Sequence, residues 1–206
     1  MDKIHGESYK MKPNELYNLI CDTQYNKVGI DVDYKILVID RTIYLLFQET
    51  TNKIDWRTNF NFPIKLYKKY YVHKGFATAY KSANDIIMNE LKQVMIEHPD
   101  SNIVVTGWSY GGAMAQLAVE DIYYRFKTKS QLVTFGAPRI FFTGIKHFRK
   151  SVSSAYMYAN INDIVTKVVP YYKSIACTKI DKYKLFGIFN PRLYHCKYDH
   201  EELYND

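Results

Sequence analysis

Apolar residues recur at helical spacing in two parts of the chain, and a third part has helical composition. Between residues 82 and 98 they fall on one face of a helix that Pro99 ends, namely Ile86, Ile87, Leu91, Val94 and Met95. In residues 13–21 the same spacing follows a Pro-Asn start, which predicts a short first helix. Residues 111–127 have helical composition throughout. The pattern therefore predicts three helices, separated by shorter apolar runs.

Those shorter runs predict strands. Residues 34–39 and 42–47 are separated only by Asp40 and Arg41, which indicates two strands joined by a tight turn. Further runs predict strands at residues 103–106, 132–135 and 155–158. Strands that alternate with helices of this length indicate an α/β fold with a mainly parallel sheet covered by helices. The ligand site of such a sheet lies at the carboxyl ends of its strands.

Composition agrees with a packed domain. The 206 residues are 47% apolar and 24% charged, which excludes a disordered chain and provides for a sizeable core. No repeat or flexible linker divides the chain, so we treat residues 1–206 as a single domain. No apolar run approaches the length of a membrane span, and the first residues lack the apolar stretch of a signal peptide. We therefore expect a soluble cytoplasmic or other intracellular protein.

The net charge of +7 raises the question of a nucleic-acid partner. Basic residues form no continuous patch of the kind that nucleic-acid binders show, so we expect none. The three cysteines have no metal-like spacing, and we expect no metal and no organic cofactor.

The clearest chemical signal is the sequence G-W-S-Y-G at residues 107–111, between a predicted strand and a predicted helix. A nucleophilic Ser109 has to project from a tight strand-to-helix turn, and the glycines around it let the two elements approach. The helix that follows directs its N-terminal dipole and the amide of Tyr110 toward the place where an oxyanion would form. The motif therefore predicts a nucleophilic serine with one oxyanion donor beside it.

A serine nucleophile needs a base and an orienting acid from elsewhere in the chain. Asp163 follows the predicted strand at residues 155–158, which brings its carboxylate to the edge of the sheet where Ser109 also lies. Only His195 and His200 come after Asp163, as the order Ser, Asp, His requires. We prefer His200, near the end of the chain where a loop can fold back over the sheet, with His195 as the alternative.

Six separated segments follow one another in the order typical of a known family. They are F-Q-E-T-T-N-K-I-D-W (47–56), H-K-G-F (73–76), V-V-T-G-W-S-Y-G-G-A (104–113), T-F-G-A-P-R (134–139), N-I-N-D-I-V (160–165) and D-H (199–200). Together they span most of the chain and resemble the fungal-type class 3 lipases of the α/β-hydrolase superfamily. The resemblance implies a catalytic triad of Ser109 as nucleophile, Asp163 as acid and His200 as base.

The same resemblance implies an oxyanion hole and a lid. Thr50 would donate to the oxyanion through its backbone amide and hydroxyl, beside the amide of Tyr110. A lid would cover about residues 51–62, with the side chains that could meet acyl chains being Ile54, Trp56 and Phe60. Ordinary core packing of Trp56 and Phe60 is the alternative.

Three positions depart from the family pattern. Glu49 stands where the family has a glycine, and a carboxylate near a developing oxyanion would raise the reaction barrier unless it points away or is neutralised. Gln48 replaces the usual Arg, and Trp108 stands where many relatives have His. Of these, Glu49 bears most directly on the chemistry.

These features predict a serine lipase or esterase that hydrolyses acylglycerol esters through an acyl-enzyme. A phospholipase A1-type acyl hydrolase is one alternative, and a catalytically impaired lipid-binding relative is another because of Glu49. The expected partners are a lipid ester substrate and, peripherally, a lipid interface. Residues 64–74 mix four lysines with aromatic residues, which suits an anionic interface, although a solvated face is the simpler interpretation.

Overall fold

The computed structural model describes residues 11–48, 64–68, 70–160, 163, 165–167, 178–180, 198, 199 and 204. Its larger sheet has seven strands: β1 (Asn26–Val28), β2 (Val32–Ile39), β3 (Thr42–Phe47), β6 (Asn102–Trp108), β7 (Ser130–Phe135), β8 (Val152–Asn160) and β9 (Thr178–Ile180). Its smaller sheet is the hairpin of β4 (Ile64–Tyr67) and β5 (Tyr70–His73). The helices are α1 (Pro13–Asp22), α2 (Lys74–Glu97), α3 (Tyr110–Phe126), α4 (Ile145–Phe148) and the short 3-10 turn η1 (Val165–Lys167).

The larger sheet is mainly parallel, as the sequence predicts. Its order is β1-β2-β3-β6-β7-β8-β9, with parallel pairing from β3 through β9 and antiparallel pairing of β1, β2 and β3. The predicted hairpin of β2 and β3 is confirmed. Its turn residues Asp40 and Arg41 have φ values of 47° and 60°, the left-handed pair that a type I′ turn needs.

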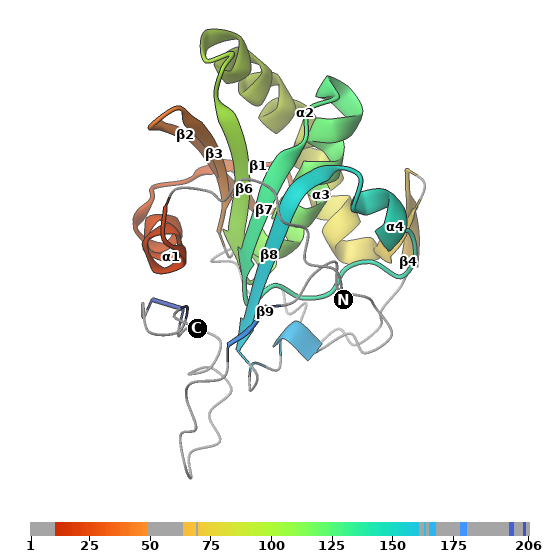
Figure 1. Ribbon diagram of the computed structural model, residues 1–206. Coiled ribbons are helices and arrows are strands. Elements are labelled where there is room, and N and C mark those ends of the chain that lie inside the picture. The colour runs from red at the N-terminus through yellow and green to blue at the C-terminus, as the bar shows by residue number, and fades with distance from the viewer. Residues whose placement is uncertain are drawn as a thin grey trace.

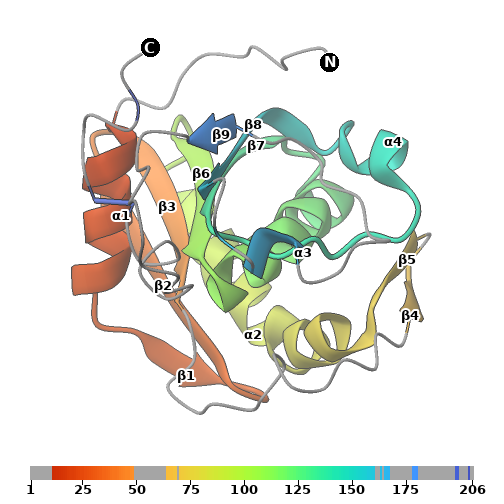
Figure 2. The same ribbon diagram turned by 90° about the horizontal axis from the view of Figure 1, so that it is seen from below.

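Helices cover both faces of this sheet (Figures 1 and 2). Helix α1 lies against one face, and α2 and α3 lie against the other. Along β3, Ile43 and Leu45 belong to the core under α2 and α3, whereas Tyr44 and Leu46 belong to the core under α1. This alternation follows from the two-residue period of a strand, and it explains why β3 is apolar at every position.

All three predicted helices are present in the structure, but the predicted start of the longest helix is wrong. Helix α2 begins at Lys74 rather than at residue 82, because Phe76 and Tyr80 are buried one turn apart and extend the apolar face backwards. Ile86, expected on that face, is 55% exposed. Neighbouring residues in a helix point about 100° apart, so Ile86 turns outward where Ile87 turns inward.

Several short elements were not predicted from the sequence pattern. The edge strands β1 and β9, the hairpin β4–β5 and helix α4 are short, and short segments carry little periodicity. Among the described residues, no helix has the length and apolar character required to cross a lipid bilayer. The segment expected to form a lid lies outside the described residues.

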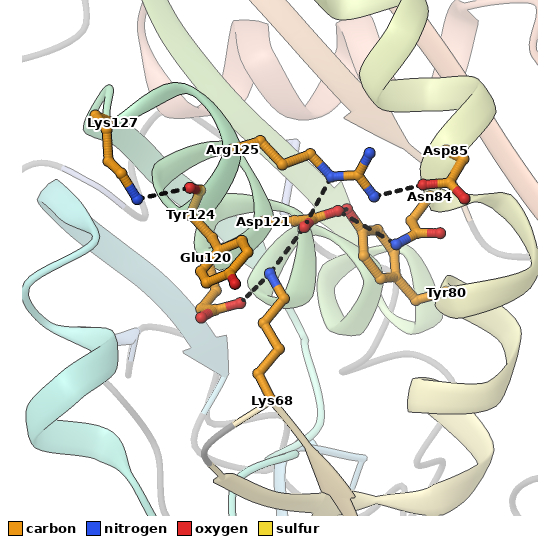
Figure 3. Close-up of polar contacts among 9 residues, drawn as sticks. All are labelled: Lys68, Tyr80, Asn84, Asp85, Glu120, Asp121, Tyr124, Arg125 and Lys127. Atoms are coloured by element: carbon orange, nitrogen blue, oxygen red, sulfur yellow. Dashed lines mark hydrogen bonds and ion pairs between the residues drawn. The ribbon is translucent and has the colours of Figure 1, made fainter.

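A group of charged side chains joins the C-terminal half of α3 to its surroundings (Figure 3). We call Lys68, Asp85, Glu120, Asp121 and Arg125 the charge cluster. The Lys68 Nζ is 2.8 Å from carboxylate oxygens of both Glu120 and Asp121, and the Arg125 Nε donates to Asp121 at 3.1 Å. The Asp121 side chain is only 2% exposed.

The charge cluster connects three elements that are distant in sequence. Lys68 lies in the turn between β4 and β5, and Arg125 reaches α2 through an ion pair of 2.6 Å with Asp85. The Tyr80 hydroxyl and the Asn84 amide donate to the second oxygen of Asp121 at 3.4 Å. These contacts fix the hairpin and α2 against α3 (Figure 3).

Candidate active site

Ser109 lies on the sharp turn between β6 and α3. Its backbone angles, φ 54° and ψ −120°, lie outside the regions that residues with a side chain ordinarily adopt. Such a conformation costs about 1–3 kcal/mol and persists only where the surroundings fix it. Here the Ser109 amide donates to the Phe135 carbonyl at 2.9 Å, and the Gly112 amide donates to the Ser109 carbonyl at 3.0 Å. Ser109 is buried.

Glycines flank this turn because any larger residue would collide with backbone. A Cβ on Gly107 would overlap the Gly111 carbonyl group, and one on Gly111 would overlap the carbonyl group of Phe47 at the end of β3. A Cβ on Gly112 would lie 2.5 Å from the Cβ of Ala137. The predicted requirement for small residues therefore has a direct steric cause: β3, β6 and α3 approach too closely for side chains.

Asp163 is buried just beyond the end of β8. Its amide donates to the Asn160 carbonyl at 3.0 Å, which turns the chain directly after the strand. Its Oδ1 accepts a hydrogen bond from the Val165 amide at 2.9 Å, and its Oδ2 accepts one from the Tyr198 hydroxyl, also at 2.9 Å. Each carboxylate oxygen has two acceptor sites, so a carboxylate can accept hydrogen bonds from several donors at once.

Tyr198 is a site residue that the sequence reasoning missed. Its buried hydroxyl donates to Asp163 and accepts from the Asn160 amide at 3.0 Å. Burial, followed by the charge of Asp163, raises the pKa of Tyr198 well above its usual value. The phenol therefore stays protonated and remains a donor. The available signal was its position, one residue before the Asp199–His200 pair.

Aromatic packing holds Tyr198 in place. The Tyr198 ring lies 5.7 Å from that of Tyr17 on α1 and 5.9 Å from that of Phe135 at the end of β7. Tyr17 also makes an edge contact with Trp108, which precedes Ser109, at 6.0 Å. Helix α1 thus supports the surroundings of both Ser109 and Asp163 from the same face of the sheet.

Ser109 and Asp163 both lie just beyond the carboxyl ends of parallel strands of the larger sheet. The bond from the Ser109 amide to Phe135 joins the end of β6 to the end of β7. The next bond, from the Gly136 amide to the Tyr158 carbonyl at 2.9 Å, joins the end of β7 to β8. These ends form the carboxyl edge of the sheet, where α/β sheets bind their ligands.

The N-terminus of α3 provides backbone donors at this edge. Tyr110 is the first residue of α3, and amides in the first turn of a helix have no acceptor within the helix. The Tyr110 ring packs against Phe76 at 5.6 Å, and burial raises the pKa of its hydroxyl. The other expected site residues lie outside the described residues: Glu49, Thr50, Ile54, Trp56, Phe60, His195 and His200.

The H-K-G-F segment, residues 73–76, contributes a buried histidine at the start of α2. His73 precedes α2, its amide donates to the Ile140 carbonyl at 3.0 Å, and its ring lies 4.6 Å from that of Phe76. Burial lowers the pKa of His73, so the neutral ring is favoured. Among the described residues, no three His, Cys, Asp or Glu side chains are grouped so that they could share a metal ion.

The relatives found by comparison with known proteins include lipases. The chain is 32% identical over 130 residues to a lipase of Rhizopus niveus, which covers 57% of this chain and 32% of the relative. It is 29% identical over 94 residues to the secreted mono- and diacylglycerol lipase A of Penicillium cyclopium, covering 46% of this chain and 31% of the relative. The matches thus span about a third of the relatives' own length.

Solved structures show the same fold. The lipase of Rhizopus microsporus var. chinensis superposes with a TM-score of 0.61 at 29% identity, covering 68% of this chain and 52% of that one. A mutant of the Penicillium cyclopium enzyme reaches a TM-score of 0.68 at 23% identity, covering 75% and 61%. The expected fold class, an α/β-hydrolase-like sheet flanked by helices, is confirmed.

The expectation of a cytoplasmic or intracellular protein is contradicted. The relatives from Penicillium cyclopium and Malassezia restricta are named as secreted lipases, which points to an extracellular setting. The expectation depended on the lack of a signal-like apolar stretch. Because signal peptides are removed from mature proteins, the lack of one in a sequence does not identify the compartment.

A family model supports the same relationship over more than half of the chain. The model for Lipase (class 3) matches residues 44–173, from β3 to beyond η1. The matched region contains the strained turn at Ser109, the glycines that permit it and the buried Asp163. The chain belongs to the class 3 lipase family.

Proposed function

We propose that this protein hydrolyses carboxylic esters of acylglycerols, with Ser109, Asp163 and His200 as its catalytic triad. The observation that carries the proposal is the position of Ser109, on a left-handed turn between β6 and α3 at the carboxyl edge of the sheet. Backbone strain of this kind is found at functional sites, where it exposes a reactive group to the substrate. The names of the relatives, lipase and mono- and diacylglycerol lipase, support acylglycerols as the substrate class.

In the acylation step, the Ser109 Oγ attacks the ester carbonyl while His200 accepts the serine proton. The charge that develops on the carbonyl oxygen is stabilised by the amide of Tyr110 at the N-terminus of α3 and by Thr50. His200 then gives its proton to the departing alcohol. Water, activated by the same imidazole, attacks the acyl-enzyme and releases the fatty acid.

Asp163 orients the imidazole and stabilises its positive form. Hydrogen bonds that Asp163 accepts from the Val165 amide and the Tyr198 hydroxyl fix the position of its carboxylate. Such a fixed carboxylate favours the tautomer in which the other ring nitrogen faces the serine. The burial of Asp163 and the hydrogen bonds that it accepts therefore support this role.

The position of Tyr198 favours His200 over His195 as the base. The Tyr198 hydroxyl is bonded to Asp163, and His200 follows Tyr198 by two residues, a length of chain that spans at most about 7 Å. His195 precedes Tyr198 by three residues, a span of at most about 10 Å. The shorter connection supports His200.

A labelled fluorophosphonate tests the nucleophile directly. We expect the native protein to become covalently modified at Ser109, and Ser109→Ala to remain unmodified. His200→Ala should lose about 1,000-fold or more in kcat on a soluble short-chain ester, whereas the matched variant His195→Ala should keep most of it. Loss of activity in His195→Ala alone would reassign the base, and absence of labelling would refute the proposed activity.

A substrate panel separates the alternatives. Tri-, di- and monoacylglycerols and a phosphatidylcholine are compared, with Ser109→Ala as the blank. Release of fatty acid chiefly from the phospholipid would identify a phospholipase A1-type enzyme. Binding of these lipids without hydrolysis would identify the impaired, lipid-binding relative, and Glu49→Gly should then restore turnover if Glu49 is the cause.

A further inference from the structure

The hairpin β4–β5 and the segment beside it present a strip of exposed apolar side chains. Leu66 and Tyr71 lie directly opposite each other in the hairpin and are 57% and 44% exposed. Ile64, two residues before Leu66 on the same face of β4, is 46% exposed. Phe142, 39% exposed, continues the strip, because its amide donates to the Tyr71 carbonyl at 2.8 Å.

The inner face of the same hairpin carries buried apolar side chains. Tyr67 and Val72 alternate with the exposed residues and are buried, and Val72 bridges to the buried Phe141. A hairpin that covers a core on one face ordinarily carries polar residues on the other. The outward apolar strip is therefore an exception to this pattern, and contiguous exposed apolar surface marks a contact site.

The charged residues within the two segments that form the strip all have one sign. The two segments that form it, residues 64–74 and 136–150, contain eight Lys or Arg residues and no Asp or Glu. Lys68 points inward to the charge cluster. Lys74, Lys146 and Lys150 are exposed. The segments that form the strip thus combine exposed apolar side chains with exposed lysines and contain no carboxylate side chain.

Both segments of the strip are connected through the chain to the carboxyl end of the sheet. Phe135, whose carbonyl accepts the Ser109 amide, ends β7, and the chain runs from there past the hairpin to α4 (Figure 1). On the other side, β5 leads into α2, whose Phe76 packs against Tyr110. Each segment of the strip is therefore connected by a short stretch of chain to residues near the turn that carries Ser109, while Lys68 fixes the hairpin turn to the C-terminal half of α3.

We propose that this strip docks the protein onto an anionic lipid surface. Leu66, Tyr71 and Phe142 would enter the boundary between head groups and acyl chains, and the flanking lysines would contact lipid phosphates. The proposal rests on the proposed function, since a lipid ester at an interface is the substrate assigned above. It adds which face meets the interface and the sign of charge that the interface carries.

A lipid surface fits better than a second protein. The cores of protein interfaces are depleted of lysine, whereas membrane-surface elements combine exposed aromatic and aliphatic residues with lysines. An array of cations without a single carboxylate in either segment is complementary to a surface of phosphates. A second copy of this basic chain would bring like charges together.

Vesicle sedimentation tests the proposal with Ser109→Ala as the background, so that no lipid is consumed. Vesicles of phosphatidylcholine are compared with vesicles in which about one third is phosphatidylglycerol. We expect binding at least about tenfold tighter to the anionic vesicles, because each lysine near such a surface contributes about fivefold.

Two sets of changes separate the apolar and charged contributions. Leu66→Ser with Phe142→Ser, and Lys74→Gln with Lys146→Gln and Lys150→Gln, should each weaken binding to anionic vesicles at least about tenfold. The matched controls change exposed residues elsewhere: Ile86→Ser with Ile96→Ser, and Lys81→Gln with Lys92→Gln and Lys129→Gln. We expect both controls to bind within about twofold of the parent.

The outcomes for docking and for catalysis are distinguishable. Hydrolysis of a dissolved short-chain ester is measured separately, in the protein that retains Ser109 and in strip variants made in that protein, and it reports the proposed function alone. Equal vesicle binding by the strip and control variants would overturn the docking proposal, and so would equal binding to neutral and anionic vesicles. A third contrary outcome is that the strip variants keep vesicle binding but lose a concentration-dependent dimer. Near-identical thermal unfolding of strip and control variants verifies that all are folded.

Discussion

The two ends of helix α3 are fixed by different kinds of interaction. At its N-terminus, Gly111 and Gly112 lie so close to β3, β6 and Ala137 that no side chain fits between them. At its C-terminal half, the cations of Lys68 and Arg125 compensate the carboxylates of Glu120 and Asp121. One end depends on steric exclusion within a short motif, and the other on charges brought together from three elements.

The N-terminal end of α3 therefore carries the proposed chemistry, whereas the C-terminal half holds neighbouring elements of the fold together. The N-terminal end presents Ser109 in a strained conformation, so small displacements there change the geometry of the reacting groups. The C-terminal end joins α3 to α2 and to the hairpin β4–β5. Changes at the two ends should therefore affect activity and stability differently.

The largest expected effect is on stability, from Asp121→Asn. Removing this buried negative charge leaves Lys68 and Arg125 without their shared partner and should lower the free energy of unfolding by about 3 kcal/mol or more. Urea unfolding measures the loss, and kcat of the folded protein should stay within about twofold. The matched control Asp85→Asn, whose side chain is 78% exposed, should cost less than about 1 kcal/mol. Equal losses in both variants would refute the distinction.

The next effect is at the other end of α3. Gly111→Ala places a Cβ against the Phe47 carbonyl, so β3 and α3 must move apart, at a cost of about 1–3 kcal/mol. Because this displaces Ser109, kcat/KM should fall about 100-fold, more than the stability change alone explains. Gly75→Ala in α2 is the control, since its Cβ would meet only the His73 ring at 3.2 Å. Retained activity in Gly111→Ala would mean that the turn tolerates displacement.

A smaller effect, from Tyr198→Phe, tests whether the site end also depends on distant residues. The change removes a hydrogen bond to the Asp163 carboxylate and should lower the free energy of unfolding by about 1.5 kcal/mol. It should also lower kcat several-fold, because Asp163 becomes less well positioned, with little change in KM. Tyr25→Phe, which removes a bond to the Ile20 carbonyl, should cost similar stability and leave kcat unchanged. An identical kcat in both variants would make Tyr198 purely structural.

The smallest expected effect is a pH dependence from His73. Burial lowers the pKa of the folded state below the ordinary value of 6.5, so the unfolded chain takes up a proton first as the pH falls. The free energy of unfolding should therefore decrease below about pH 6.5 and be fully present above it. His73→Gln should flatten this slope in urea unfolding at several pH values, whereas His98→Gln, at an exposed position, should not. An unchanged slope would assign the pH dependence to other groups.

The same contrast explains what the sequence could predict. The turn at Ser109 is legible because its steric demands concern adjacent residues, and Gly107, Gly111 and Gly112 stand within one motif. The sheet order was predictable in kind, because alternating strands and helices favour parallel pairing. The position of Asp163 after β8 followed from the same reasoning, while its triad role stays a proposal.

Features that depend on contacts between distant residues were not predictable. Tyr198 is recognised as a partner of Asp163 only when two segments 35 residues apart are brought together. The charge cluster joins Lys68 to Asp121 across 53 residues, and no local pattern marks either residue. The early start of α2 depends on what Phe76 and Tyr80 pack against. In each case tertiary packing decides what local spacing leaves open.

The β2–β3 turn at Asp40 and Arg41 has a practical consequence. Both residues are exposed, and because β3 runs parallel to β6, the turn lies at the end of the sheet opposite Ser109. A surface attachment engineered at Asp40 or Arg41 would orient the carboxyl edge away from a solid support. Immobilised protein would then keep its reactive end accessible to the bulk medium.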